Sequence, residues 1–405
     1  MPRAALLTLA MLILLTGCSG GSSRATSEPV DTAPPAPEPP PASFEIPRLP
    51  PGPHYGIIVG FDDLTTGPFD RTANADRLLD EAALAGASIS RIQVDWSELE
   101  PSPGVYDGIA LDASLAGGSA REQSVYVTLS TLDTDGLTVP ADLLNENGRF
   151  VAGLTAASPE VVQRFTDFLE WMVPRLDESV WALSLGNEVD APINDDFASP
   201  EDALVFFRAG IERVRSLDPD IAVSVTLTIG SPDTQPDFTR DLMSELTLST
   251  FNHYCLDEVI QVSAEDQWER DIALIKTASA GLPIMIQELG CPVGYGDDGM
   301  GAVPRPANGL GGDPDIQAAY FAFFDRLFLE DPQFRAATVF QLYDWSPELA
   351  ELFGDLLRDG GDELAGDRLE EWLATVGLCR WADGTCRPAW DVFLQSLRNQ
   401  AQARQ

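Results

Sequence analysis

The sequence predicts an α/β protein built as a single (β/α)8 TIM barrel. Eight short β-rich segments alternate with helical segments between residues 54 and 400. Most of these segments are continuous apolar runs, which is typical of parallel strands buried on both faces. Polar and acidic residues follow directly after several strands, where barrels of this kind carry their functional groups. A doubly wound open sheet would also alternate strands and helices, but the number of strands favours a closed barrel.

The predicted strands, in chain order, are Tyr55–Phe61, Ser88–Asp95, Ser124–Ser130, Val180–Asn187, Ile221–Thr228, Thr247–Tyr254, Pro283–Gln287 and Ala337–Leu342. Three of the intervening helices should begin with a capping residue followed by proline, a pattern typical of helix starts. These starts are Ser158-Pro159, Ser199-Pro200 and Asp313-Pro314. The other helical segments are Ala75–Gly86, Leu111–Glu122, Asp237–Leu246, Ala264–Ala280 and Pro388–Asn399. Residues 346–378 form an acidic helical insertion that we expect to roof part of the cleft.

The N-terminus predicts export and lipid attachment. Residues 1–17 combine Arg3 with an apolar run from Ala4 to Leu15, which suits a signal peptide and is too short to span a bilayer. The run ends at Leu15-Thr16-Gly17-Cys18, which resembles the bacterial lipobox, so Cys18 is the expected lipidation site. An ordinary cleaved signal with an incidental thiol is the alternative. Ser19, rather than an aspartate, follows the cysteine, which resembles outer-membrane sorting in Gram-negative bacteria. The resemblance implies localisation in the cell envelope, with the protein anchored to the outer membrane or cell surface.

Residues 18–53 predict a disordered tether between the lipidated cysteine and the folded domain at 54–400. Residues 19–53 contain eleven prolines together with Ser, Ala, Thr and Glu, a composition that favours an extended chain over a packed core. The tether would hold the domain away from the membrane surface.

The charge is strongly acidic, with 25 basic against 64 acidic residues and a formal net charge of −39. Such a surface repels phosphates, which argues against nucleic acid as a partner. Adaptation to salt is the simplest interpretation of the charge. The two histidines, His54 and His253, are too few for a histidine-rich zinc site. No metal or cofactor is expected, because the chain also lacks a P-loop and a dinucleotide fingerprint.

Two cysteine pairs can be considered in the folded part. Cys379 and Cys386 flank a short glycine-containing segment and should form a disulfide in an oxidising compartment. Cys255 and Cys291 lie at the ends of two predicted strands. They could pair if those strands are neighbours, or remain as two buried thiols.

Two glutamates stand at the ends of predicted strands. The fourth strand leads into Gly186-Asn187-Glu188, and the seventh leads into Gln287-Glu288. A barrel would direct both carboxyl groups into one cleft from roughly opposite sides. Cleavage of a glycosidic bond needs such a pair, because one carboxyl protonates the leaving oxygen while the other attacks the anomeric carbon or activates water.

These strand-end motifs resemble those of glycosidase clan A, the barrel group that includes glycoside hydrolase family 5. The resemblance implies that Glu188 is the acid/base, Glu288 the nucleophile, and Asn187 the partner of the sugar 2-hydroxyl. Arg91 is similar to the arginine beside the nucleophile, and Tyr254 to the tyrosine that donates a hydrogen bond to it.

Three further residues are candidates for substrate binding. Trp345 resembles the tryptophan that lies under the sugar at the cleavage point. Trp96 is either a sugar contact or part of the barrel-rim core, and His253 is either a hydroxyl partner or a rim residue. The third strand, Tyr126–Thr131, carries no motif that we recognise.

The resemblance therefore implies a retaining glycoside hydrolase that cleaves a β-linked oligosaccharide or polysaccharide by double displacement. A carbohydrate is the expected partner, together with a membrane through the lipid anchor. Two alternatives remain open at this point. One is a surface lipoprotein that binds carbohydrate without turnover. The other is a transglycosylase that uses the same two glutamates.

Overall fold

The computed structural model describes residues 44–60, 64, 69–134, 136–191, 193, 199–296 and 308–405. The predicted signal peptide, Cys18 and most of the predicted tether lie outside these residues. Within the described ranges, no helix combines the length and the apolar character that crossing a membrane requires.

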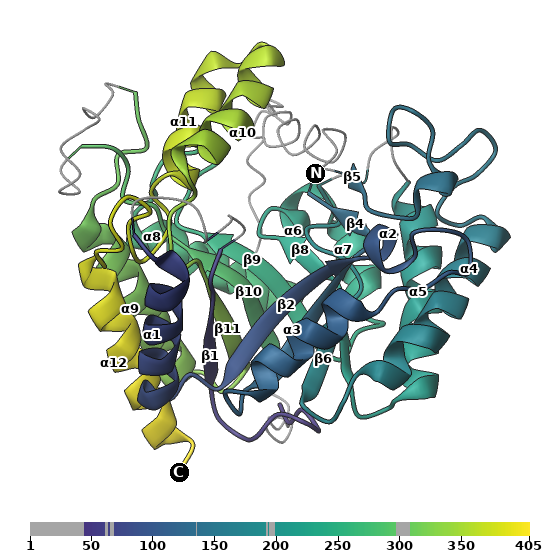
Figure 1. Cartoon of the computed structure of the whole chain (residues 1–405), viewed down its shortest axis with the longest axis horizontal. Helices are drawn as coiled ribbons and strands as arrows, with labels where there is room; N and C mark the ends of the chain where they lie inside the picture. Colours follow the sequence, from purple (N-terminus) through teal and green to yellow (C-terminus); the bar gives the residue numbers. More distant parts are fainter. Residues whose placement is uncertain are drawn as a thin grey trace, which may run out of the picture.

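The described strands form a barrel with its helices on the outside (Figure 1). One parallel sheet has the order β1 (His54–Ile58), β11 (Phe334–Phe340), β10 (Ile284–Gly290), β9 (Ser249–Tyr254) and β8 (Thr226–Thr228). The other has the order β2 (Ile89–Asp95), β3 (Ser124–Ser130), β6 (Val180–Ser184) and β7 (Ala222–Ser224). The two halves of the fifth barrel strand, β7 and β8, are separated by Val225 and pair with β6 and β9 respectively.

The remaining seam of the barrel lies between β1 and β2. The backbone N–H of Ser88 donates to the carbonyl of Tyr55 at 3.0 Å, so the two strands begin side by side. A Cβ atom on Gly56 would lie 2.2 Å from the carbonyl oxygen of Ile89, and only glycine permits this approach. The ring of strands is therefore complete, which confirms the predicted (β/α)8 fold.

Among the described residues, the barrel helices are α1 (Arg71–Ala85), α3 (Ile109–Ser119), α4 (Pro159–Met172), α5 (Pro200–Leu217), α7 (Pro236–Met243), α8 (Glu265–Ala278), α9 (Pro314–Glu330) and α12 (Pro388–Ala403). Ser199 and Asp313 accept hydrogen bonds from backbone N–H groups of α5 and α9, as their sequence patterns predict. Ser158 does not cap α4 in this way, because its hydroxyl accepts a bond from the N–H of Thr155 instead.

Additional elements interrupt the alternation of strands and helices. They are α2 (Trp96–Leu99), the hairpin β4 (Leu132–Asp133) and β5 (Gly136–Leu137), α6 (Ser231–Thr234), α10 (Pro347–Asp359), α11 (Glu363–Leu373) and the 3-10 turns Ala141–Leu143 and Val173–Arg175. The helices α10 and α11 come from the predicted insertion and stand together at the C-terminal end of the strands (Figure 1).

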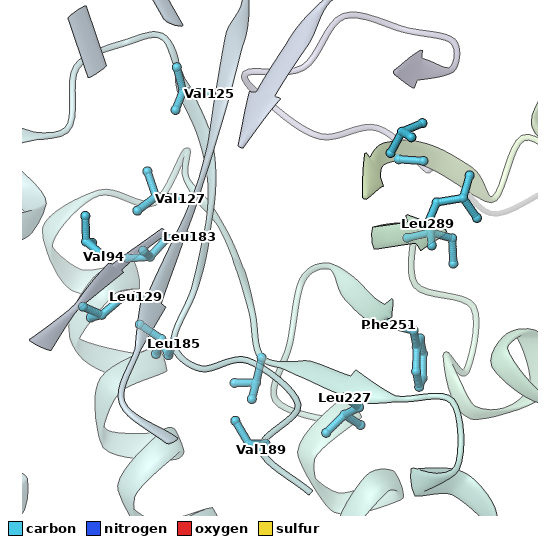
Figure 2. Packing of buried hydrophobic residues seen from close by; sticks show 14 of the residues in the cluster. Val94, Val125, Val127, Leu129, Leu183, Leu185, Val189, Leu227, Phe251 and Leu289 are labelled. Carbon is cyan, nitrogen blue, oxygen red and sulfur yellow. The ribbon is translucent and has the colours of Figure 1, made fainter. Parts of the chain in front are cut away.

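The main core lies between the outer faces of the strands and the helices. Every second residue of a strand points to this layer, and Figure 2 shows Val94, Leu129 and Leu183 gathered there. These three side chains are at most 6% exposed. The layer fixes the strands, and the strands in turn fix the direction of the side chains at their ends.

Residues 44–53 close the N-terminal end of the barrel. Ile46 and Leu49 are buried against the residues that fill this end, which include Tyr126, Met285 and Ala336. Backbone carbonyls of the segment accept hydrogen bonds from three side chains. The buried Arg335 donates to Phe44, Pro50 and Gly52, and the buried His54 lies 2.8 Å from the carbonyl of Pro50. The partly exposed Arg404 donates to the carbonyl of Pro53. The predicted tether extended to residue 53, but its last ten residues belong to the folded domain.

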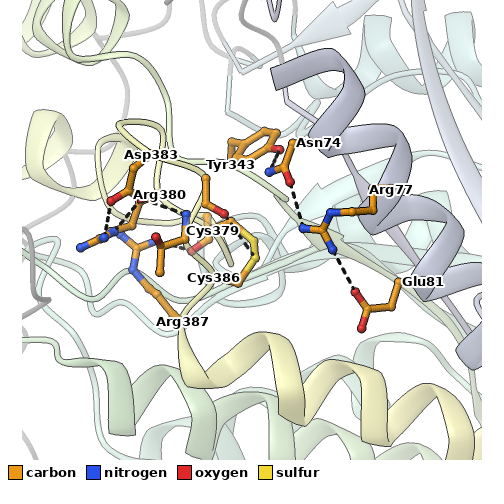
Figure 3. The surroundings of a disulfide bond; sticks show 12 residues. Asn74, Arg77, Glu81, Tyr343, Cys379, Arg380, Asp383, Cys386 and Arg387 are labelled. Atoms are coloured by element: carbon orange, nitrogen blue, oxygen red, sulfur yellow. Dashed lines mark hydrogen bonds and ion pairs between the residues drawn. A yellow bond between two sulfur atoms is a disulfide. The ribbon is translucent and has the colours of Figure 1, made fainter. Parts of the chain in front are cut away.

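Two disulfides constrain loops at the C-terminal end of the barrel. Cys379 pairs with Cys386, as the sequence predicts, and Figure 3 shows this bond beside Tyr343 and Arg387. Cys255 pairs with Cys291, which connects the residue after β9 to the residue after β10. The pairing of Cys255 and Cys291 was open from the sequence, and the neighbouring positions of β9 and β10 settle it.

Candidate active site

The two glutamates meet at the C-terminal end of the barrel. Glu288 lies within β10 and is 6% exposed, whereas Glu188 follows β6 and is partly exposed. Both belong to one connected set of hydrogen bonds. Glu188 is linked through Asn252 and Asn187 to Gln287, and Gln287 is linked through Thr128 and Arg91 to Glu288.

A β-bulge directs Glu288 into the site. In the pairing of β10 with β9, Ile286 lies opposite Phe251 and Glu288 lies opposite Asn252, so Gln287 is an extra residue. Strict alternation would send Gln287 and Glu288 to opposite faces, and the extra residue re-aims the second side chain. The side chains of both therefore make contacts on the inner side of the barrel.

Glu288 is held by two donors. Nη1 of Arg91 lies 2.7 Å from Oε1, and the two side chains are only 2% and 8% exposed. The hydroxyl of Tyr254 donates to Oε2 at 2.5 Å. Burial and the charges of Glu288 and Glu188 raise the pKa of Tyr254 well above its ordinary value, so this group keeps its proton. Both partners stabilise the charged form of Glu288, as a nucleophile requires.

Arg91 is itself oriented by its neighbours on β2 and β3. Its Nε donates to the hydroxyl of Thr128 at 3.0 Å, and its Nη2 donates to Oε1 of Gln93 at 2.6 Å. Because Arg91 and Gln93 lie two residues apart on one strand, both point to the same side of the sheet. These bonds fix the orientation in which the guanidinium of Arg91 contacts Glu288.

The backbone of Glu188 adopts a left-handed conformation with φ of 46°. A residue with a side chain is uncommon in this region, and such strain costs on the order of 1–3 kcal/mol. The flanking backbone is fastened on both sides: the N–H of Asn187 donates to Leu132 at 3.0 Å, and that of Val189 donates to Thr226 at 3.2 Å. The turn presents the carboxyl of Glu188 to the barrel axis.

The carboxyl of Glu188 has two partners. Its Oε1 accepts from Nδ2 of Asn252 at 2.9 Å, and its Oε2 accepts from the hydroxyl of Thr134 at 2.7 Å. Burial and, second, the negative charge of Glu288 raise the pKa of Glu188 to about 8, against the lowering effect of these two hydrogen bonds. Glu188 therefore carries its proton at neutral pH, and the two carboxyls differ in the way that acid and nucleophile must differ.

Asn187 is positioned by groups that the sequence did not reveal. Its Nδ2 donates to Oδ1 of Asp133 at 2.9 Å, while its Oδ1 accepts from Gln287 at 2.6 Å and from Asn252 at 3.2 Å. Gln287 in turn accepts hydroxyl bonds from Tyr126, Thr128 and Thr226. This buried network of amides and hydroxyls holds the side chain of Asn187 in a fixed orientation at the site.

The hairpin after β3 supplies two site residues that sequence reasoning missed, Asp133 and Thr134. No motif marks them, although polar residues directly after a buried strand are the signal that could have identified them. Gln287, directly before Glu288, was also missed, because a regular strand would turn it away from the site.

The structure does not bring Trp96 to the two carboxyls. Its side chain is fully buried and packs against Phe165 and Phe168 of α4 and Phe206 of α5. Its indole N–H donates to Glu100 at 2.8 Å. The prediction of a sugar contact at this residue is therefore wrong, and the alternative interpretation as core is the correct one.

His253 also lies outside the site. It alternates with Asn252 and Tyr254 on β9, so it points to the helices while they point inward. Its Nδ1 lies 2.6 Å from the hydroxyl of Tyr320 on α9, and its Nε2 lies 3.3 Å from Asp271 on α8. The prediction of a substrate contact at His253 is corrected accordingly.

Trp345 lies in a second apolar cluster, at the foot of α10. Its ring packs edge-on against Phe353 at 5.0 Å, and the residue is 7% exposed. The same cluster contains Phe340, whose ring is 5.7 Å from that of Tyr254. Trp345 is thus near the residues that surround Tyr254, and its predicted role under a sugar stays a prediction.

Comparisons with known proteins support the fold. No protein-family model and no curated protein sequence match the chain. Among solved structures, it is similar to the exo-β-1,4-mannosidase Op5Man5 from Opitutaceae bacterium strain TAV5, with 15% identity over 88% of this chain and a TM-score of 0.61. The match spans 60% of that longer protein.

Two other solved structures are similar over most of the chain. A GH5_18 protein from Streptomyces cattleya, in complex with Manβ1-4GlcNAc, matches with 16% identity, 86% of this chain, 81% of its own length and a TM-score of 0.62. A family 39 glycoside hydrolase from Bacteroides cellulosilyticus WH2 matches with 14% identity, 87% of this chain, 65% of its own length and a TM-score of 0.54. At these identities, the comparisons establish a shared barrel fold.

Proposed function

We propose that the protein is a retaining glycoside hydrolase, with Glu188 as acid/base and Glu288 as nucleophile. The observation that carries this proposal is that Glu188 and Glu288 belong to one hydrogen-bond network but have different surroundings. Glu288 faces a guanidinium and a phenol, whereas the partly exposed Glu188 accepts only from an amide and a hydroxyl and has its pKa raised to about 8. A glycosidase needs one ionised and one protonated carboxyl on opposite sides of the scissile bond.

In the first step, an oxygen of Glu288 attacks the anomeric carbon as the glycosidic bond breaks. The proton of Glu188 passes to the departing oxygen, so the leaving group departs as an alcohol. The glycosyl ester that forms has no negative charge at Glu288. The negative charge of Glu288, the second largest cause of the raised pKa at Glu188, is then removed. Glu188 becomes a base for the incoming water, and the ester is hydrolysed with net retention of configuration.

We propose β-linked glycosides as the substrate class, with β-mannosides the first to test. Two of the similar structures support this choice, one named as an exo-β-1,4-mannosidase and one in complex with Manβ1-4GlcNAc. Asn187 occupies the position that, by resemblance to clan A, meets the sugar 2-hydroxyl. Its amide is held by Asp133 and Gln287, so it is oriented before a substrate binds.

The experiment is a panel of aryl β-glycosides and β-linked oligosaccharides, followed by proton NMR of the first anomer released. Retention predicts that β-substrates yield the β-hemiacetal before mutarotation. Release of the α-anomer first would contradict the proposal. Products longer than the substrate would indicate transglycosylation, and binding without any product would indicate a carbohydrate-binding protein.

We also propose that the enzyme acts at the cell envelope, anchored through Cys18. The lipobox-like sequence supports this, as does the path of residues 44–53, which run beneath the end of the barrel opposite Glu188 and Glu288. A tether joined there would leave the catalytic end facing away from the membrane. Incorporation of labelled palmitate in the wild type, and its loss in Cys18→Ala, tests the anchor.

A further inference from the structure

The hydroxyl of Thr134 lies between two carboxyl groups. Its oxygen is 2.7 Å from Oε2 of Glu188 and 3.2 Å from Oδ1 of Asp133. A hydroxyl has one proton, so it can donate to only one of the two at a time, and it can accept a bond through its lone pairs. The group is therefore able to respond to whether Glu188 is charged or neutral.

The surroundings of Glu188 decide which oxygen can carry its proton. Oε1 faces the amide nitrogen of Asn252, which only donates. Oε2 faces the hydroxyl of Thr134, which can accept. A proton on Oε2 of Glu188 can therefore be donated to the hydroxyl oxygen of Thr134. A proton on Oε1 would face the amide nitrogen of Asn252, which cannot accept it. When Glu188 is neutral, Thr134 must turn its own proton elsewhere, and Asp133 is within reach.

Asp133 is a fixed acceptor for that proton. Its Oδ2 accepts from Ser130 at 2.8 Å and from Gln93 at 3.1 Å, and its Oδ1 accepts from Asn187 at 2.9 Å. The backbone N–H of Thr134 also donates to Oδ1, at 2.7 Å. All of these partners are donors, so they stabilise the carboxylate, and they fix its position from β2, β3, the loop after β6 and the hairpin itself.

We propose that Thr134 is a positioning residue whose hydroxyl switches between Asp133 and Glu188 as Glu188 loses and regains its proton. This inference rests on the proposed acid/base role of Glu188. In the first step, Glu188 gives its proton to the leaving group, and the Thr134 hydroxyl rotates to donate to the new carboxylate. In the second step, Glu188 takes a proton from water and the hydroxyl rotates back to Asp133. No proton leaves Thr134, so the switch adds no chemical step.

The hairpin that carries Thr134 is attached by backbone hydrogen bonds to the turn that carries Glu188. The N–H of Thr138 donates to Thr131 at 3.0 Å, which closes the hairpin, and the N–H of Asn187 donates to Leu132 at 3.0 Å. The second bond attaches the hairpin to the turn that carries Glu188. Thr134 and Glu188 therefore keep their relative positions as one unit.

Several charged or titratable groups surround Glu188 and the Thr134 hydroxyl, and two of them, Glu288 and Asp190, raise the pKa of Glu188. The groups are Glu288 on β10, Asp190 on the same loop, Asp133 on the hairpin, Tyr254 on β9 and, beyond Glu288, Arg91 on β2. Of these groups only Asp133 loses a contact in Thr134→Val, and it keeps its bonds from Ser130, Gln93, Asn187 and the backbone N–H of residue 134. The bond that Thr134 donates to the ionised carboxylate is stronger than the bond it accepts from the neutral acid, because one partner is then charged, so loss of the hydroxyl should raise the pKa of Glu188 further.

The test compares Thr134→Val, which removes the hydroxyl at nearly constant volume, with Thr134→Ser, which keeps it. The matched control is Thr138→Val in the same hairpin, where the hydroxyl has no hydrogen-bond partner among the described residues. For an aryl glycoside with a poor leaving group, kcat/KM should fall about 10- to 100-fold in Thr134→Val, the scale of a bond to a charged group. It should stay within about 2-fold in Thr134→Ser and Thr138→Val.

Two readouts separate a switch from a purely structural role. In Thr134→Val, the alkaline limb of the pH profile of kcat/KM should move to higher pH. The rate of the first step with a dinitrophenyl glycoside should change little, because its leaving group departs without a proton from Glu188. An unshifted limb, or equal losses on both substrates, would overturn the proposal.

Carbon-13 NMR of labelled glutamate supplies a titration of Glu188 that does not depend on turnover. The resonance is assigned with Glu188→Gln, and its midpoint should rise in Thr134→Val but not in Thr134→Ser. An unchanged midpoint would contradict the switch even if no substrate had been found. A raised midpoint without any turnover would leave the switch standing and contradict the proposed function instead.

Discussion

The two ends of the barrel are built from the same strands in opposite ways. At the N-terminal end, Ile46 and Leu49 pack on apolar residues such as Met285 and Ala336. At the C-terminal end, amides, hydroxyls and carboxyls fill the interior. The strand β10 shows the change within a few residues, from Met285 at the apolar end to Glu288 at the polar end. The difference places stability at one end and chemistry at the other.

The polar end depends on complete pairing. Gln287 accepts three hydroxyl bonds and donates to Asn187, and each buried group left without its partner would cost about 1–3 kcal/mol. Glu188 adds a strained backbone, with φ of 46°. At the apolar end, the contacts of Ile46 and Leu49 with the core are nondirectional, and the hydrogen bonds run to backbone carbonyls of residues 44–53. Substitutions at the two ends should therefore separate loss of activity from loss of stability.

The largest expected effect is that of Glu288→Gln at the polar end. The variant keeps the size of the side chain but removes the nucleophile, so kcat/KM should fall by at least about 10⁴-fold. Thermal unfolding should remain a single transition, since the amide still accepts from Tyr254. Turnover near the wild-type rate would show that Glu288 is not the attacking group.

Leu49→Ala should have the opposite profile at the apolar end. It removes a buried side chain that is 4% exposed and should lower the free energy of unfolding by about 2–4 kcal/mol. Urea denaturation measures this loss. The kcat/KM of the folded variant should match the wild type, and a large loss of kcat/KM would show that the two ends are coupled.

Gln287→Leu probes the network beneath the catalytic pair. The hydroxyls of Tyr126 and Thr226 lose an acceptor and Asn187 loses a donor, so the variant should be destabilised by about 2–3 kcal/mol. Unlike Leu49→Ala, it should also lower kcat/KM, because Asn187 is no longer held in place. Unchanged kinetics in a destabilised variant would show that the network is structural only.

The smallest effect is on stability as a function of pH. Because the pKa of Glu188 is raised to about 8 in the folded protein, its contribution is fully present below the unfolded value near 4.5 and is lost as pH rises through 8. Glu188→Gln should therefore be a few degrees more stable than the wild type at pH 9, but not at pH 4. Equal differences in Tm between the two proteins at pH 4 and pH 9 would contradict the raised pKa of Glu188 in the folded protein.

Continuous apolar runs made the barrel and its strand-end glutamates predictable, because a parallel strand shows its burial in its own composition. The bulge at Gln287 was not predictable, since it depends on the pairing of β10 with β9. The prediction that Tyr254 points into the site could have excluded His253 from it, because adjacent residues of a strand point to opposite faces. Pro-rich surroundings concealed Ile46 and Leu49, whose burial depends on contacts distant in the sequence.

The most direct test of the paired roles of Glu188 and Glu288 is covalent trapping. A 2-deoxy-2-fluoro β-glycoside with a good leaving group slows the second step more than the first, so a glycosyl ester accumulates. Mass spectrometry of the digested protein should place the sugar on the peptide that contains Glu288, and Glu288→Gln should remain unlabelled. A label on Glu188, or on any other residue, would contradict the account.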